Sequence, residues 1–96
     1  MSPGPSDRGF FYLNLMQELP KNWSELNNAL VREFQFDTYF GGVEFVQQVA
    51  ELAEAVQHHP CITIDYTTVL ISLQTHDAGN VVTEKDVELA AAINKL

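Results

Sequence analysis

Apolar and polar residues alternate near the start of the chain in a pattern that predicts a β-hairpin. Its strands are Trp23–Leu26 and Leu30–Phe36, and Asn27-Asn28 between them is a suitable turn pair. Apolar side chains of the second strand share one face, where Arg32 interrupts the alternation. The aromatic side chains of this hairpin are therefore most simply core residues: Trp23, Phe34 and Phe36.

A run of β-branched residues later in the chain predicts a second hairpin. Its strands are Ile62–Tyr66 and Val69–Thr75, joined by Thr67-Thr68. Asp77–Asn80 is expected to form a loop, because it combines Asp, Gly and Asn.

Spacings of three and four between apolar residues predict a helix over Val43–Gln57, with Asp37 or Thr38 as its N-cap. The helix is expected to end near His58, since Pro60 disfavours helical geometry in the residue before it. The predicted apolar stripe consists of small and medium-sized side chains: Val43, Val46, Val49, Ala50, Ala53 and Val56.

A last helix is predicted to begin at Thr83–Asp86, which resembles a capping box with Asp in place of the usual Glu, and to run to about Lys95. A shorter helix over Phe10–Leu19, ended by Pro20, is expected to cap the core. The last helix should bury Val87, Ala90, Ala91 and Ile93 or their neighbours.

This order of elements predicts an α+β fold: a two-layer β-β-α-β-β-α arrangement whose four-stranded antiparallel sheet is packed by helices on one face. A chain of 96 residues has room for one domain, expected over residues 10–96. Residues 1–9 are rich in Ser, Pro and Gly and are expected to form a disordered tail. Because the core is small, oligomerisation would help stability.

The net charge and the cysteine content limit the functions and cellular locations that are expected for this chain. A net charge of −8 without a Lys/Arg cluster argues against direct nucleic-acid binding. Cys61 is the only cysteine, so no intrachain disulfide can form, which favours a reducing compartment and a cytoplasmic location. We expect no membrane association, because the apolar run Phe10–Met16 is far shorter than a span and no secretory signal stands out.

The candidate catalytic residues of this sequence are the three histidines, His58, His59 and His76, because they all lie in one short stretch. Histidine is the side chain that titrates nearest neutral pH, so imidazoles brought together predict a proton-transfer site. Glu54 precedes His58 by one helical turn, and a carboxylate and a helix C-terminus both favour the charged imidazole. The sequence therefore predicts that His58 is readily protonated and suits a general acid.

Other interpretations of these residues stay open at this point. His58 could serve only as a helix cap, and three histidines could hold zinc, although adjacent histidines rarely converge on one ion. Glu54 could be a solvated helix charge. Asp86 could be catalytic, but a capping-box residue is more often structural.

The spacing of these residues resembles the signature of the pterin-4a-carbinolamine dehydratase family. The resemblance covers about Leu19–Leu96 and includes the first hairpin, Thr75–Gly79 and Thr83–Asp86. The residues that carry the spaced pattern are Glu54, His58-His59-Pro60, Tyr66, His76 and Asp86.

The resemblance implies a β-β-α-β-β-α fold with an extra N-terminal helix, assembled as a homodimer or as a homotetramer of two dimers. It implies a hydro-lyase that removes water from 4a-hydroxytetrahydropterin, in tetrahydrobiopterin recycling, to give quinonoid dihydropterin. No metal or organic cofactor is implied, because the pterin is the substrate. Reduction of the product regenerates the cofactor of aromatic amino acid hydroxylases, which implies a functional link to such an enzyme.

The resemblance also implies roles for single residues. His58 and His76 are expected to transfer protons, and His59 to hold the substrate near its hydroxyl and share the acid role. Which imidazole donates and which accepts stays open. Glu54 either binds a ring N–H or tunes His58. The other expected substrate-binding residues are Thr75 and Asp86, of which Asp86 also orients the site.

Three features depart from the common family pattern. The N-terminal helix is short and matches the pattern poorly. The loop before the last helix is one residue longer, through Asn80–Val82, and Cys61–Asp65 lacks the aromatic residues of some animal members. The resemblance also allows a non-catalytic alternative, because animal members act as dimerisation cofactors of a transcription factor and divergent relatives serve in assembly. The intact histidines favour catalysis.

Overall fold

The computed structural model describes residues 19–96, which form one antiparallel sheet covered by two helices. The predicted tail and the predicted helix over Phe10–Leu19, except its last residue, lie outside the described residues. The first hairpin is β1 (Ser24–Leu26) and β2 (Ala29–Gln35), and the second is β3 (Cys61–Asp65) and β4 (Thr68–Leu73). Helix α2 (Tyr39–Val56) joins the hairpins, and α3 (Glu84–Ile93) follows them.

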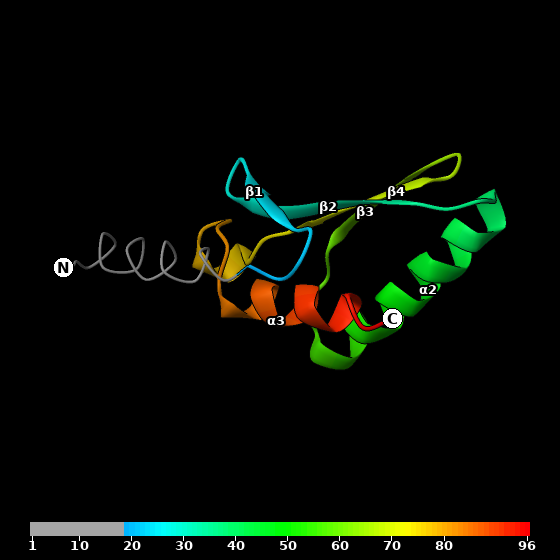
Figure 1. Ribbon diagram of the computed structural model, residues 1–96. Coiled ribbons are helices and arrows are strands. Elements are labelled where there is room, and N and C mark those ends of the chain that lie inside the picture. The colour runs from blue at the N-terminus through cyan, green and yellow to red at the C-terminus, as the bar shows by residue number, and fades with distance from the viewer. Residues whose placement is uncertain (1–18) are drawn as a thin grey trace.

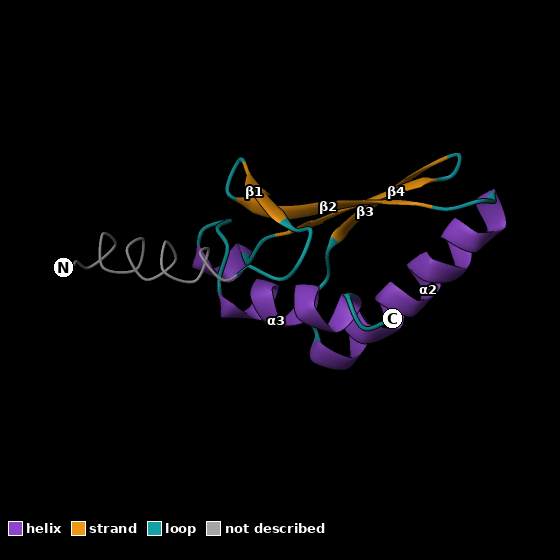
Figure 2. Ribbon diagram, viewed as in Figure 1, coloured by secondary structure: helices purple, strands orange, loops and turns teal. Residues whose placement is uncertain are grey.

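The four strands pair in the order β1-β2-β4-β3, and every neighbouring pair is antiparallel. Both helices lie on the same face of the sheet, as Figures 1 and 2 show. The predicted α+β fold, with two hairpins separated by a helix and followed by another, is therefore confirmed for residues 19–96.

The turn chemistry explains both hairpins. Asn27 and Asn28 have φ angles of 54° and 65°, the left-handed pair that a two-residue turn between twisted strands requires. The second turn is Tyr66-Thr67, so the expected turn at Thr67-Thr68 was one residue late. Thr68 instead pairs with Asp65 at the start of β4.

Helix α2 begins four residues before the predicted start. Thr38 is the N-cap, and its hydroxyl oxygen accepts a hydrogen bond from the Gly41 N–H at 2.9 Å. The apolar pattern missed this turn because Tyr39 and Phe40 are exposed and contribute nothing to the buried face. The helix ends at Val56, where Gln57 adopts a left-handed conformation with φ 54°.

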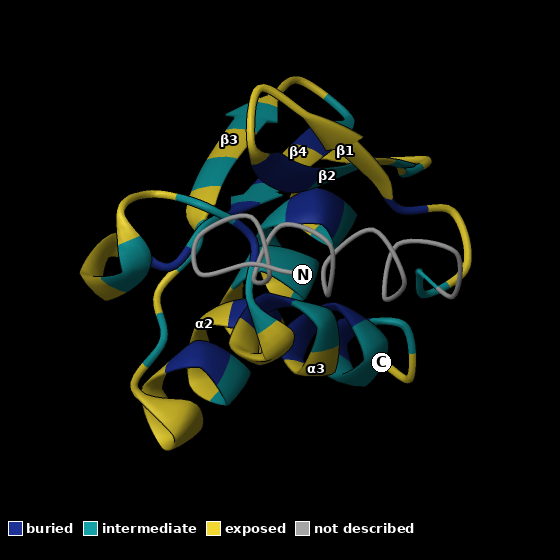
Figure 3. Ribbon diagram, turned by 90° about the vertical axis from the view of Figure 1, so that its left-hand side faces the viewer, coloured by how far each residue is buried: buried dark blue, intermediate teal, exposed yellow. Residues whose placement is uncertain are grey.

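The core lies between the helical layer and the inner face of the sheet, as the buried segments in Figure 3 show. Of the predicted helical stripe, Val49 and Ala53 are buried, whereas Ala50 and Val56 are exposed. The remaining fully buried aliphatic side chains come from three elements: Leu30 of β2, Val69, Ile71 and Leu73 of β4, and Ala90 and Ile93 of α3.

Arg32 interrupts the apolar alternation of β2 because its guanidinium ties the sheet to the end of α3. Its Nη1 donates to Asn94 Oδ1 at 2.6 Å, and its Cζ lies 4.2 Å from the centroid of the Phe34 ring. The Trp23 indole N–H donates to the same Asn94 oxygen at 2.9 Å. Trp23 is buried as predicted, while Phe34 and Phe36 are half-buried at the margin of the core.

Candidate active site

All three histidines line one shallow cleft of about 260 Å³. Three segments that are distant in sequence build it: the residues after α2, the end of β4 with the short 3₁₀ turn η1 (His76–Ala78), and the first turn of α3. The lining side chains are Gln57, His58, His59, Thr75, His76, Asp77 and Lys85.

His58 is held by Asp86, not by Glu54. Its Nε2 lies 2.5 Å from Asp86 Oδ1, and the two side chains are 13% and 0% exposed. The expected pairing of Glu54 with His58 was wrong because the left-handed Gln57 ends the helix, so that residue 58 leaves the helical path. The carboxylate that faces His58 therefore comes from a helix 28 residues further along the chain.

Glu54 instead contacts the second histidine. Its Oε2 lies 2.6 Å from His59 Nε2, and the side chains of Glu54 and His59 are 70% and 55% exposed. A pair this exposed is screened by solvent and contributes little to stability. Its effect is to fix the direction in which the His59 ring points.

Asp86 is the centre of a buried hydrogen-bond network. Its Oδ2 accepts from the Thr83 N–H at 2.8 Å and from the Thr75 hydroxyl at 2.9 Å. The two threonine hydroxyl oxygens lie 2.6 Å apart, and Thr83 Oγ1 accepts from the Lys85 N–H at 3.2 Å. The predicted capping box is therefore present, and it also orients a cleft residue.

His76 lines the cleft from the turn after β4, a different segment of the chain from the end of α2 that carries His58 and His59. Its Nδ1 is 2.6 Å from Asn80 Oδ1, within a tight turn that contains Gly79 at φ 90° and Asn80 at φ 62°. The backbone of Thr75 closes this turn, because its carbonyl accepts from the Asn80 N–H at 3.1 Å. The extra loop residue noted in the sequence thus belongs to the segment that aims His76.

The partners of the three imidazoles fix which nitrogen carries the proton in each neutral ring. Each ring has one nitrogen against an oxygen that accepts: a carboxylate for His58 and His59 and an amide carbonyl for His76. That nitrogen must donate, so we assign the hydrogen to Nε2 of His58 and His59 and to Nδ1 of His76. The other nitrogen of each ring is then free to accept a proton from a ligand.

The structure thus brings together four of the sequence-predicted site residues in the cleft, His58, His59, His76 and Thr75. Glu54 and Asp86 do not line the cleft, but each contacts one of the histidines that do. Sequence reasoning missed Lys85, which lines the cleft from the first turn of α3. The available signal was its position in the capping-box motif, where Lys85 directly precedes Asp86.

Within residues 19–96, no three His, Cys, Asp or Glu side chains lie close enough together to hold a metal ion. The same part of the chain contains no helix that is both long and apolar enough to cross a membrane.

Comparison with known proteins identifies the family. The family model for pterin 4 alpha carbinolamine dehydratase matches residues 12–96. A protein of Thermomicrobium roseum is 45% identical over 83 residues, 86% of this chain and 87% of its own. A protein of Chloroflexus aggregans is 51% identical over 76 residues, which cover 78% of this chain and 80% of its own. Both carry pterin-4-alpha-carbinolamine dehydratase as a provisional name.

Two solved structures have the same fold. A transcriptional coactivator/pterin dehydratase from Brucella melitensis superposes with a TM-score of 0.78 at 30% identity, covering 86% of this chain and 89% of its own. A pterin dehydratase-like protein described as a RuBisCO assembly factor in the alpha-carboxysome gives 0.61 at 26% identity, covering 76% and 83%. The chain belongs to the pterin 4 alpha carbinolamine dehydratase family, as the resemblance implied.

Proposed function

We propose that this protein is a hydro-lyase that converts 4a-hydroxytetrahydropterin to quinonoid dihydropterin and water, in tetrahydrobiopterin recycling. The observation that carries the proposal is the cleft in which three imidazoles of a dehydratase-family chain meet. The pterin is the substrate in this proposal, and no metal or organic cofactor takes part.

The reaction moves two protons at neighbouring atoms of one ring. The oxygen on C4a must receive a proton to leave as water, and N5 must lose a proton as the C4a–N5 double bond forms. A positioned acid or base contributes about 10²–10⁴-fold to such a step. Two imidazoles that line one cleft from different segments of the chain suit this pair of transfers.

The surroundings of the histidines support a division of roles. His58 is the proposed acid in its charged form, in which Nδ1 also carries a proton. That proton passes to the oxygen on C4a, and the buried carboxylate of Asp86 on Nε2 stabilises the positive charge of the ring before the transfer. His76 is the proposed base, with its free Nε2 taking the N5 proton. His59 is the proposed contact to the departing hydroxyl.

The remaining site residues are proposed to position these three. Glu54 orients His59, and Asp86 orients His58. Thr75 shapes the wall of the cleft while its hydroxyl donates to Asp86, so its contribution to substrate binding comes from the shape of that wall.

The proposal is tested by the loss of the 4a-hydroxypterin absorbance with and without the protein, in metal-free buffer. We expect acceleration by the unmodified protein and a loss of about 10²–10⁴-fold in kcat for His58→Ala and for His76→Ala. Cys61→Ser is the matched control, because Cys61 is exposed on β3 and does not line the cleft. Equal rates for both histidine variants and the unmodified protein would refute the mechanism.

A second candidate function is a non-catalytic role in dimerisation, coactivation or assembly on the same fold. The similarity to the carboxysomal assembly factor favours it. A stoichiometric protein partner together with no turnover of the pterin would support this alternative. For the enzyme we propose a homodimer or homotetramer, which sedimentation would distinguish, and a functional link to an aromatic amino acid hydroxylase.

A further inference from the structure

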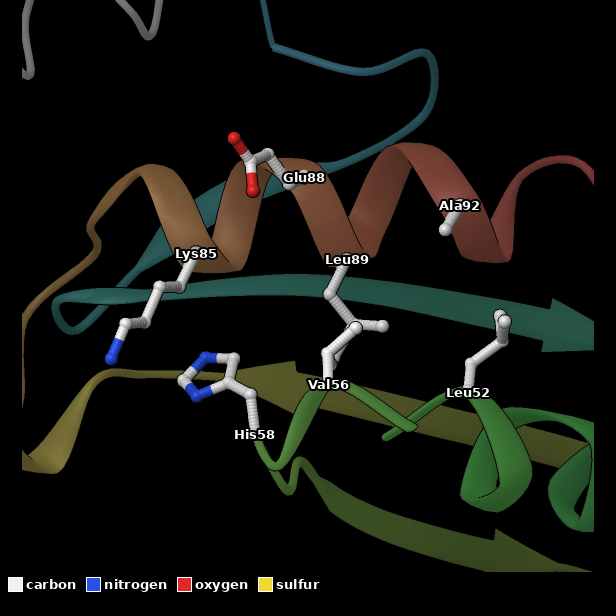
Figure 4. A pocket seen from close by; sticks show the side chains of 7 residues that line it. All are labelled: Leu52, Val56, His58, Lys85, Glu88, Leu89 and Ala92. Atoms are coloured by element: carbon white, nitrogen blue, oxygen red, sulfur yellow. The ribbon is translucent and has the colours of Figure 1, made fainter. Parts of the chain in front are cut away.

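A narrow groove between α2 and α3 opens beside the histidine cleft. It encloses about 200 Å³. Its walls are the aliphatic side chains of Leu52 and Val56 on α2 and of Leu89 and Ala92 on α3, together with His58 and Lys85. Figure 4 shows that the seventh side chain, Glu88, points away from the other six.

The groove and the histidine cleft share two walls. His58 and Lys85 line both hollows. In Figure 4 these two residues lie at one end of the row, Leu52 and Ala92 lie at the other, and Val56 and Leu89 lie between. The polar end of the groove is therefore the end that meets the cleft, and the groove becomes purely aliphatic away from it.

We propose that this groove receives the C6 substituent of the same molecule whose ring occupies the cleft, so that the dihydroxypropyl chain of a biopterin is accepted there but an apolar substituent is bound better. The inference rests on the proposed dehydratase function. In a 4a-hydroxytetrahydropterin, N5 is bonded to both C4a and C6, so C6 lies two bonds from C4a and the first atom of its substituent lies three bonds away. The groove begins at His58, which acts on the oxygen of C4a, so the substituent is positioned to enter it.

The lining selects an alkyl or aryl group over a hydroxylated chain. Aliphatic walls gain from burying apolar surface, whereas a hydroxyl placed among them loses its water without gaining a partner. Val56 is 58% exposed in the protein alone, so a ligand in the groove would cover an aliphatic side chain that is now open to water. Lys85 borders the entrance with its alkyl stem and keeps its ammonium group at the polar end.

The test compares kcat/KM for 4a-hydroxytetrahydropterins that carry methyl, phenyl or dihydroxypropyl groups at C6. We expect the phenyl compound to be preferred about tenfold over the dihydroxypropyl one. Ala92→Leu narrows the groove and is expected to lower kcat/KM for the phenyl compound about tenfold while leaving the methyl compound unchanged. Ala50→Leu is the control, since Ala50 is exposed on α2 and lines neither hollow.

The outcomes separate this proposal from the function on which it rests. No turnover of any of the three compounds refutes both. Turnover of all three with no preference, and no selective effect of Ala92→Leu, overturns the groove proposal alone. If Ala92→Leu changes the mass of the protein in solution but not its preference among the three compounds, the groove is an interface between copies of the chain. That result also overturns the groove proposal. If Ala92→Leu does not fold, Val56→Thr repeats the test. This substitution keeps the volume of the side chain but places a hydroxyl in the groove, and Val56 is exposed in the protein alone.

Discussion

At the level of single residues, Asp86 connects the folding of α3 to the chemistry of His58. A fully buried carboxylate is stable only when hydrogen bonds compensate for its lost hydration. Asp86 has three such bonds, from a backbone N–H, a hydroxyl and an imidazole. The same contacts that stabilise the helix start therefore fix the ring orientation of a proposed acid.

Replacing Asp86 with Asn tests this coupling. The variant keeps the shape of the side chain but removes the negative charge beside His58, so we expect kcat to fall by about 10²-fold or more. Thr83→Ala is the matched control, because it removes the cap hydroxyl and costs about 1 kcal/mol of stability but leaves the carboxylate on His58. A rate loss in Thr83→Ala equal to that in Asp86→Asn would show that only helix stability matters.

The exposed pair Glu54–His59 makes a contrasting prediction. Glu54→Gln keeps a hydrogen-bond acceptor for His59 Nε2 and removes only a solvent-screened charge. We expect a change of less than about tenfold in kcat, much smaller than that of Asp86→Asn. Steady-state kinetics of the two variants side by side provide the comparison, and an equal loss in both would contradict the assignment of His58 as the acid.

At the level of secondary-structure elements, the caps of α2 decide where the cleft residues lie. Thr38 begins the helix with a side-chain hydrogen bond to the Gly41 N–H. Gln57 ends it in a left-handed turn, with its backbone N–H bonded to the carbonyls of Ala53 and Glu54. This turn sends His58 toward α3 and leaves His59 beside Glu54.

Removing the N-cap is expected to weaken the helix without changing the site. Thr38→Ala should lower the free energy of unfolding by about 1 kcal/mol, because one N-terminal N–H loses its partner. Denaturant titration measures this loss. The rate per folded molecule should stay unchanged, since Thr38 lies at the other end of α2 from the cleft, and an altered rate would contradict that separation.

Local patterns were sufficient to predict most of the elements. The Asn-Asn turn, the β-branched runs and the Thr83–Asp86 box each depend on a few neighbouring residues, and each is present in the structure. The His58–Asp86 contact could not be derived in this way, because it depends on how α3 packs against the end of α2. The positive φ of Gln57 also could not be predicted from the sequence, because glutamine rarely adopts this conformation.

At the level of the whole molecule, Asn94 links the last helix to the first hairpin. Its amide oxygen accepts from Trp23 and Arg32, and its Nδ2 donates to the Lys21 carbonyl at 3.1 Å. These contacts span 62 to 73 residues of sequence. They hold α3 over the sheet, and α3 carries the residues that complete the cleft.

Asn94→Ala is therefore expected to destabilise the whole domain. It leaves an indole N–H and a guanidinium partly buried without their acceptor, which costs about 1–3 kcal/mol for each such group. Gln35→Ala, which removes only an exposed side-chain pair with Thr68, is the control and should change stability by less than about 0.5 kcal/mol. Thermal unfolding of both variants gives the comparison, and equal midpoints would refute a linking role for Asn94.

The most direct test of the proposed mechanism is a crystal structure with a non-reacting dihydropterin bound. We expect the ring to lie in the cleft between the end of α2 and the turn at His76. The free nitrogen of His58 should then lie beside C4a and that of His76 within hydrogen-bonding distance of N5. A ring bound elsewhere, or bound with both imidazoles turned away from it, would rule out proton transfer by His58 and His76.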